Sequence, residues 1–572
     1  MTFDLIVQNG TVIDGTGNDR FKADLGIRNG LIVEIAPGLD ARQARRTIDA
    51  DGCIVAPGVI DVHTHYDAQI HWDPYCTGSS WHGTTTVVVG NCGFGFAPCE
   101  ADPEVRDRYM LMMQNTEQVP YAAMREALGW DWTTFPEYME HLRRVPKGVN
   151  VATYLPMNPL MIYVMGIDAA KSRPATDIER ARMRELLSEA MDAGAIGFAF
   201  SYLQEHNTHV DFDGSVMPSD GMAVEEAYNL ARVLRERGDG MIHALVEVPG
   251  AVNHREVAAE LARISGRPVL HNIITPFDTL DTHRDVLAFL DDCADEGLEV
   301  YSQSFSHRSW TEFNAIDNSG WDFNPELREF TSCGDARDKV RKAADPDFRR
   351  RMRENYDPAV MIPAGGPIDT WLLVDAHGSE RFGPYEGALL AEVARREGLH
   401  ITDAFFEIVV DSNGLADFRT SEAMSHDLKM HQEILRNERV IPGTSDGGAH
   451  VKFYSGGQYS TDLLTWMARD EQRFTLEQIH WRLSSLPARV VGLSKRGELR
   501  KGYAADLVVY DLDRLGFNRD RYDLVQDLPG GEYRRICRAQ GIDHVIVGGE
   551  SIVEAGNCTT ALPGKILTNH GP

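Results

Sequence analysis

The sequence predicts an α/β protein with a (β/α)8 barrel of the TIM type and a small β-sandwich formed by the two ends of the chain. Two observations lead to this fold class. Strand-like runs alternate with helix-patterned stretches through the middle of the chain, which is typical of parallel strand pairing. Both termini are instead rich in short strands and turns. The 572 residues suffice for such a barrel with insertions, since the fold takes about 250 residues.

Eight short runs account for the predicted barrel strands. In chain order they are GVIDVHTH, TTTVVVGNC, NVATYLPM, AIGFAFSY, MIHALVEV, PVLHNIIT, LEVYSQSF and VIPGTSD. Helical patterns separate most of them, and one helix is predicted to begin at Thr176, where Thr176 and Glu179 match a capping box. Eight alternating units favour a closed barrel over residues 57–488.

The barrel interval is longer than the fold requires, so it must contain insertions. We place the largest at about residues 304–384, where the alternation of strands and helices is lost. Residues 1–56 and 489–572 both show short β-like pieces bounded by turns. Because neither end is large enough to bury a core alone, the two are predicted to pair as a β-sandwich.

Composition indicates a soluble, cytoplasmic protein. No apolar run approaches the about 20 residues of a membrane helix, and the start MTFDLIVQNG lacks the features of a signal peptide. The net charge of −29 repels phosphate backbones and anionic lipid, so neither nucleic acid nor a membrane is an expected partner. The eight cysteines include no CxxC pair and are interpreted as reduced thiols. A homo-oligomer is compatible with the sequence.

Histidines at the ends of predicted strands indicate a metal centre. His63 and His65 lie two residues apart on one strand, so both point to the same face, about 6 to 7 Å from each other. His243 and His271 each lie on a later short apolar run, and Asp446 follows the last strand. These strand ends meet at the rim where such barrels keep their active sites. Imidazole and carboxylate ligands suit zinc or a similar divalent ion.

The order of motifs resembles the amidohydrolase superfamily, and more narrowly its D-aminoacylase (N-acyl-D-amino-acid deacylase) branch. The similarity covers nearly the whole chain and is carried by GVIDVHTHYD, GTTTVVVGNCGFGFAP, the two later histidine strands, GTSDGG, SLPARVVGL, RGELRKGYAADLVVYD and GIDHVIVGGESIVEAGNCTTALPG. The resemblance implies one or two zinc ions. It assigns His63 and His65 to one position, His243 and His271 to the other, and Cys92 to a ligand that can bridge the two. Many amidohydrolases use a carboxylated lysine from strand four instead, and GFAFSY contains none.

The expected chemistry is amide hydrolysis by metal-activated water. Bound zinc lowers the pKa of water from about 15.7 to about 7. Asp446 is expected to take the water's proton and to pass it to the leaving nitrogen. We therefore expect a zinc-dependent hydrolase of N-acyl amino acids, D-configured ones included, or of related linear amides.

The substrate contacts are less well defined by the sequence. After His271 the chain reads Asn272-Ile273-Ile274, without a basic residue that could hold a substrate carboxylate. The replacement candidates near the rim are Tyr301, His307, Arg308, His450 and Lys452. The segment TYLPMNPLMIYVMG is a candidate for an apolar acyl pocket. Two alternatives stay open: a hydrolase of cyclic amides, imides or ureides, and a non-catalytic barrel scaffold.

Overall fold

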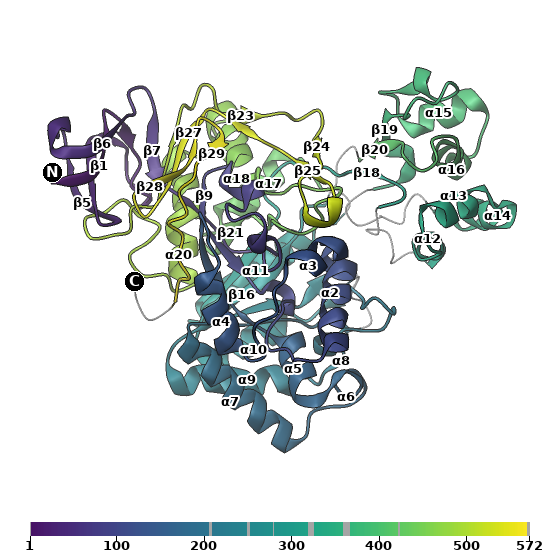
Figure 1. The fold of residues 1–572 in the computed structure, drawn as a ribbon, viewed down its shortest axis with the longest axis horizontal. Coiled ribbons are helices and arrows are strands. Elements are labelled where there is room, and N and C mark those ends of the chain that lie inside the picture. The colour runs from purple at the N-terminus through teal and green to yellow at the C-terminus, as the bar shows by residue number, and fades with distance from the viewer. Residues whose placement is uncertain are drawn as a thin grey trace.

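The computed structural model describes residues 2–204, 209–248, 252–277, 280–317, 325–357, 366–420 and 424–568. Figure 1 shows a main body of strands and helices, a β-rich region in which N-terminal and C-terminal strands lie together, and a smaller lobe set apart from the body. Within the described ranges, no helix is both long and apolar enough to cross a membrane.

The central strands are all parallel to their neighbours and follow one another in chain order. Each of the eight predicted runs contains one of these strands, except NVATYLPM, which contains both β10 and β11. Only Tyr154 separates β10 from β11, and a parallel bridge between Thr64 and Gly447 relates the segments that follow the first and last strands. The strands are β8 (Val59–Asp61), β9 (Thr84–Val89), β10 (Asn150–Thr153), β11 (Leu155–Pro156), β12 (Gly197–Ser201), β13 (Met241–Leu245), β16 (Val269–Ile274), β17 (Val300–Ser304) and β21 (Val440–Pro442).

Alternate residues of these strands face two different cores. One buried cluster takes a residue from every predicted strand run: Ile60, Val88, Ala152, Ala199, Met241, Leu270, Tyr301 and Ile441. Because all of these runs contribute to one cluster, we call this the inner face of the strands. Their sequence neighbours, such as Ile242 and Val269, belong to a larger cluster that also contains helix residues. This alternation follows from the period of two in a β-strand, and it decides which side chains reach the inner face.

Helices connect the parallel strands and cover their outer face. The helix α7 (Asp177–Ala193) begins at the predicted capping box, where the Thr176 and Glu179 side chains each accept the other's backbone N–H, and it ends at Gly194 with φ of 111°. Its buried residues recur every three or four positions, as an amphipathic helix requires. The other connecting helices include α2 (Pro103–Glu117), α3 (Tyr121–Ala127), α4 (Phe135–Arg144), α5 (Met157–Met165), α9 (Glu225–Arg237), α10 (Arg255–Ser265), α11 (Thr282–Asp295) and α17 (Leu428–Arg436).

Strands from the two ends of the chain pair directly. Strand β7 (Ile54–Pro57) is antiparallel to β22 (Leu507–Tyr510), which also pairs with β27 (Ile542–Val547) and through it with β28 (Glu550–Glu554). A second sheet contains β5 (Leu31–Ala36), β4 (Asp24–Arg28), β1 (Phe3–Gln8) and β6 (Ala44–Asp49). One buried cluster joins the two sheets and includes Leu5, Leu25, Val55, Leu507 and Ile546.

The lobe lies between β17 and β21 in the chain and has its own hydrophobic cluster. Its sheet has the order β18 (Glu312–Asn314), β20 (Asp417–Arg419), β19 (Leu372–Asp375), and its helices are α12 (Pro325–Thr331), α13 (Ala336–Ala344), α14 (Pro346–Asn355), α15 (Leu390–Glu397) and α16 (Ile401–Asp411). The lobe therefore extends beyond residue 384, because its central strand is β20. The basic run on α14 is paired within the lobe, for example Arg353 with Asp403 at 2.9 Å.

Candidate metal centre

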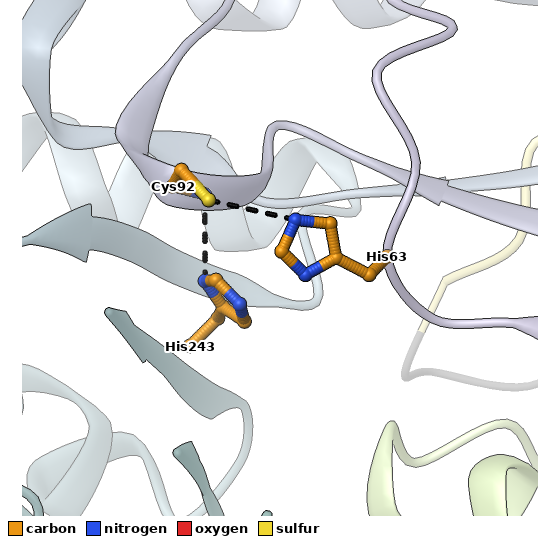
Figure 2. A group of neighbouring side chains, drawn as sticks. All are labelled: His63, Cys92 and His243. Atoms are coloured by element: carbon orange, nitrogen blue, oxygen red, sulfur yellow. Dashed lines mark hydrogen bonds between the residues drawn. The ribbon is translucent and has the colours of Figure 1, made fainter. Parts of the chain in front are cut away.

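Three of the predicted ligands meet between β8, β9 and β13. His63 lies just after β8, Cys92 lies in the short turn η3 (Asn91–Gly93) after β9, and His243 lies on the inner face of β13. The Nε2 atom of His63 is 3.5 Å from Cys92 Sγ, and the backbone N–H of Cys92 is 3.4 Å from His243 Nδ1. Figure 2 shows Cys92 between the two imidazole rings. The potential ligand atoms of these residues all lie within 4.8 Å of one another, and all three residues are buried.

A second group shares His63 with the first. The Oδ1 atom of Asp446 lies 3.3 Å from His63 Nε2 and 3.8 Å from His65 Nε2. Asp446 follows β21, and its φ of 48° places it in the left-handed region at the sharp turn that leads to Gly447. The potential ligand atoms of this second group, which consists of His63, His65 and Asp446, also lie within 4.8 Å of one another. The two overlapping groups offer room for one or two cations.

The charge states of these side chains suit a metal ion. Burial lowers the pKa of His63 to about 4 and holds the pKa values of His65 and His243 well below the usual range, so all three are neutral near pH 7 with a lone pair available. Burial raises the pKa of Asp446 to about 7 and that of the Cys92 thiol well above its usual value. Neutral imidazoles, a thiol and a carboxylate in one dry site form the donor set that zinc uses.

Gln303 orients two of the histidines and was not found by sequence reasoning. Its Oε1 atom lies 2.8 Å from His63 Nδ1 and 3.3 Å from His243 Nε2. Because an amide oxygen only accepts, these two ring nitrogens must donate, which leaves His63 Nε2 and His243 Nδ1 without a proton and directed toward Cys92, whose backbone N–H donates to His243 Nδ1. The sequence contains only a weak indication that Gln303 reaches the centre. Gln303 lies two residues after Tyr301 on β17 and therefore shares its inner face, yet a single glutamine has no ligand signature.

His271 lies on the other face of its strand, which corrects its prediction as a ligand. Its Nδ1 atom is 2.9 Å from Ser302 Oγ, its Nε2 atom is 3.3 Å from Glu247 Oε2, and its ring packs against Phe289 of α11. Since Leu270 points inward, the next inward position on β16 is Asn272, whose Nδ2 atom lies 3.9 Å from Cys92 Sγ. The structure therefore brings five of the six predicted ligands together and leaves His271 outside.

Two of the predicted substrate contacts are cations that already have partners. Arg308 forms an ion pair with the buried Asp462 at 2.6 Å and lies over the Trp466 ring. Lys452 Nζ lies 2.8 Å from a Glu532 oxygen and 3.2 Å from one of Asp317. Neither is free to hold a substrate carboxylate, which corrects these two predictions.

Of the other substrate candidates, Tyr301 belongs to the inner cluster and lies on the same strand face as Gln303, but deeper in the protein. Its ring is covered by the guanidinium of Arg439, so it does not reach the rim. His307 is buried with its Nε2 atom 3.1 Å from Tyr454 Oη. His450 is brought near the centre: its Nδ1 atom is 3.0 Å from Gln118 Oε1. The methionines Met157 and Met161, predicted to line an acyl pocket, are buried in the core around α5.

A carboxylate that the sequence did not indicate also reaches the centre. Glu117 is the last residue of α2, its side chain is 1 % exposed, and its Oε2 atom lies 3.5 Å from His65 Nε2 and 3.8 Å from His450 Nε2. It belongs to no motif and lies at the end of a helix rather than of a strand, so a search of strand ends cannot find it.

Comparison with known proteins agrees with this geometry. The amidohydrolase family matches residues 46–553. An uncharacterized protein of Mycobacterium tuberculosis is 30% identical over 549 residues, covering 91% of this chain and 87% of that protein. A D-aminoacylase of Alcaligenes xylosoxydans xylosoxydans is 29% identical, covering 89% and 88% of the two chains.

A solved structure shows the same likeness. N-acyl-D-glutamate deacylase from Bordetella bronchiseptica, complexed with zinc and a phosphonate inhibitor, has a TM-score of 0.66 and 25% identity to this chain, with 99% and 100% of the two chains covered. The family match spans most of the chain, and the relatives that align over 89% or more of it include a D-aminoacylase and an N-acyl-D-aspartate deacylase. The chain therefore belongs to the amidohydrolase family and to its D-aminoacylase-like branch.

Proposed function

We propose that this chain is a zinc-dependent hydrolase that cleaves N-acyl amino acids or related linear amides. The observation that carries the proposal is the meeting of His63, His65 and Asp446 with Cys92 and His243 in one buried centre. We further propose that residues 57–488 form a closed (β/α)8 barrel, and that residues 1–56 and 489–572 form a β-sandwich beside it. The parallel neighbour order and the pairing of β7 with β22 support this arrangement.

The proposed ligands are His63, His65, Cys92, His243 and Asp446, with one or two zinc ions. When bound, zinc supplies Lewis acidity and lowers the pKa of a bound water to about 7. Gln303 fixes the ring orientation of His63 and His243 and keeps their free nitrogens turned toward the centre. His271 is not among the proposed ligands.

Asp446 is the proposed catalytic base and acid. Burial raises its pKa to about 7, so near neutral pH it can accept a proton from water and return one to the leaving nitrogen of the substrate. Its Oδ1 atom also lies beside His63 and His65, so this proton acceptor is next to two of the proposed metal ligands.

The proposed substrate is a small linear amide whose binding does not depend on Arg308 or Lys452. Two relatives that align over 99% of this chain are N-acyl-D-aspartate deacylase and N-acyl-D-glutamate deacylase by name. In this chain, His450 is the proposed substrate contact, supported by its Nε2 atom at 3.8 Å from Glu117 Oε2 and its Nδ1 atom at 3.0 Å from Gln118 Oε1.

One experiment tests the proposed function. Purified protein is analysed for zinc and then assayed for amine release from matched N-acyl-D-amino acids, N-acyl-L-amino acids and cyclic amides. We expect zinc to copurify and linear amides to be cleaved, with activity removed by a chelator and restored by zinc. If the protein cleaves only cyclic amides, the proposed substrate class is wrong. If it binds zinc in stoichiometric amounts but releases no amine from any of these compounds, the proposed hydrolytic activity is contradicted.

A further inference from the structure

Glu117 is buried without a cationic partner. Its Oε1 atom has no hydrogen-bond partner among the described residues, and its Oε2 atom faces the imidazoles of His65 and His450. Both of these rings are held neutral by burial, which lowers their pKa values. A buried carboxylate costs several kcal/mol of folding free energy unless a cation or a proton compensates it, so a partner is expected at this position.

Lysine and arginine do not supply that partner. Within the described ranges, no ion pair joins Glu117 to either residue type, and the segments outside those ranges contain no lysine or arginine in the sequence. The charged side chains that act on Glu117 are the carboxylates of Asp446 and Asp67, which add further negative charge. Without a bound cation, burial and these two carboxylates raise the pKa of Glu117 well above its usual range, so a proton takes the place of the missing charge. A divalent cation that binds there would displace that proton.

The distance to His65 matches shared coordination. Two ligand atoms that bind one tetrahedral zinc ion at about 2.0 to 2.2 Å lie about 3.4 Å from each other. The Oε2 atom of Glu117 lies 3.5 Å from His65 Nε2, which is also within 3.8 Å of Asp446 Oδ1. A cation bound by His65 would therefore lie within reach of the Glu117 carboxylate.

The backbone holds this carboxylate in place. The N–H of His450 donates to the carbonyl oxygen of Glu117 at 2.7 Å, and His450 Nδ1 lies 3.0 Å from the side-chain oxygen of Gln118. These contacts tie the last turn of α2 to the segment that follows Asp446. The end of α2 is thus fixed to the same chain segment that supplies a proposed ligand.

We propose that Glu117 is a further carboxylate ligand of the centre, on the side of His65 and Asp446. This inference rests on the proposed zinc centre and deepens it. With the Cys92 thiolate and Asp446, it brings the anionic ligands of the centre to three. This larger negative charge favours occupancy of the His65 side by a divalent cation.

The test compares Glu117→Gln with Glu104→Gln, which changes an exposed glutamate at the other end of α2. Zinc bound per chain is measured at fixed free zinc concentrations after removal of metal, together with the rise in melting temperature that zinc produces. We expect Glu117→Gln to bind one zinc ion at least about tenfold more weakly. Glu104→Gln should match the wild type.

The melting temperature of the metal-free variant separates a lost ligand from a folding defect. Metal-free Glu117→Gln should melt no lower than the metal-free wild type, because the substitution replaces a buried carboxyl group that has no cationic partner and keeps the shape. Its zinc-induced rise should be smaller. Glu117→Asp, which keeps the charge on a shorter side chain, should bind zinc with intermediate affinity.

Identical zinc binding curves for the wild type and Glu117→Gln would overturn the ligand assignment, even if the Michaelis constant for an amide changed. The result is independent of the substrate. If the wild type binds zinc but cleaves no amide, the proposed function fails while the zinc curves still decide the role of Glu117.

Discussion

The two halves of the metal centre differ in the ligands that surround them. On the side of β8, His63 and His65 adjoin Asp446, and the Glu117 carboxylate lies beside them. On the side of β9 and β13, Cys92 and His243 adjoin Asn272, an amide in the inward position where a second histidine was predicted. The β8 half is thus rich in imidazole and carboxylate, whereas the Cys92 half depends on one thiol, His243 and the shared His63. From this difference we expect the β8 half to hold an ion without a histidine from β16.

The strongest way to break both halves is to remove His63, the residue that they share. His63→Asn should lower zinc content and reduce the rate of amide cleavage by at least about a thousandfold, because the activated water is lost. Zinc analysis and amine release measure the two effects. His377→Asn, an exposed change in the lobe, is the matched control, and full activity in His63→Asn would exclude a shared ligand.

Removal of Asp446 should impair the β8 half alone. Asp446→Asn keeps the shape but cannot accept a proton, so kcat should fall about 10²- to 10⁴-fold, which is the usual contribution of a general base. The variant should retain the ion of the Cys92 half, which zinc analysis can measure. An unchanged kcat would remove Asp446 from the mechanism.

Gln303 connects the halves, so its removal should weaken both to a smaller extent. Gln303→Leu loses the acceptor for His63 Nδ1 and His243 Nε2, and zinc affinity should fall about 10- to 100-fold. Chelator competition gives the affinity. Gln303→Glu keeps an acceptor oxygen and should lie closer to the wild type; equal affinities in all three proteins would show that the contact does not matter.

The zinc affinities of the two halves should also respond differently to a fall in pH. Burial raises the pKa of the Cys92 thiol well above its usual value, so zinc must displace a proton from it at any pH below that value. Zinc affinity of the Cys92 half should therefore fall about tenfold for each pH unit of acidification. Zinc titrations at several pH values test this, with Cys92→Ser as the comparison; a pH-independent affinity would exclude thiolate ligation.

The smallest effect is expected at Lys452. Because its ammonium group is held by Asp317 and Glu532, Lys452→Met should leave the Michaelis constant for an N-acyl amino acid within about twofold of the wild type, since only partly exposed ion pairs are lost. Steady-state kinetics measure it. A large rise in that constant, with kcat unchanged, would return Lys452 to the substrate site.

The sequence was most informative where chemistry and strand position coincide. His63, His65 and Asp446 were predicted at the ends of strands, and the structure brings them together. His271 differs because a displacement of one residue along a strand turns a side chain to the other face, and the sequence does not show which of two neighbours points inward. Arg308 and Lys452 were misjudged because their partners, Asp462 and Glu532, are distant in the chain.

Glu117 and Gln303 show a different limit. Neither belongs to a ligand motif, and each reaches the centre only because helix α2 and strand β17 are packed around it. Long-range contacts of this kind depend on tertiary structure rather than on local spacing. The outline of the fold was accessible from the alternation of strands and helices, whereas the residues that support the metal ligands were not.

The most direct test of the central claim is a zinc titration of metal-depleted protein with amine release from an N-acyl amino acid as the readout. We expect no activity without zinc, a rise in rate that follows zinc bound per chain, and no recovery in His63→Asn. Full activity in the metal-depleted protein, or complete zinc binding without release of amine from any linear amide, would contradict the account.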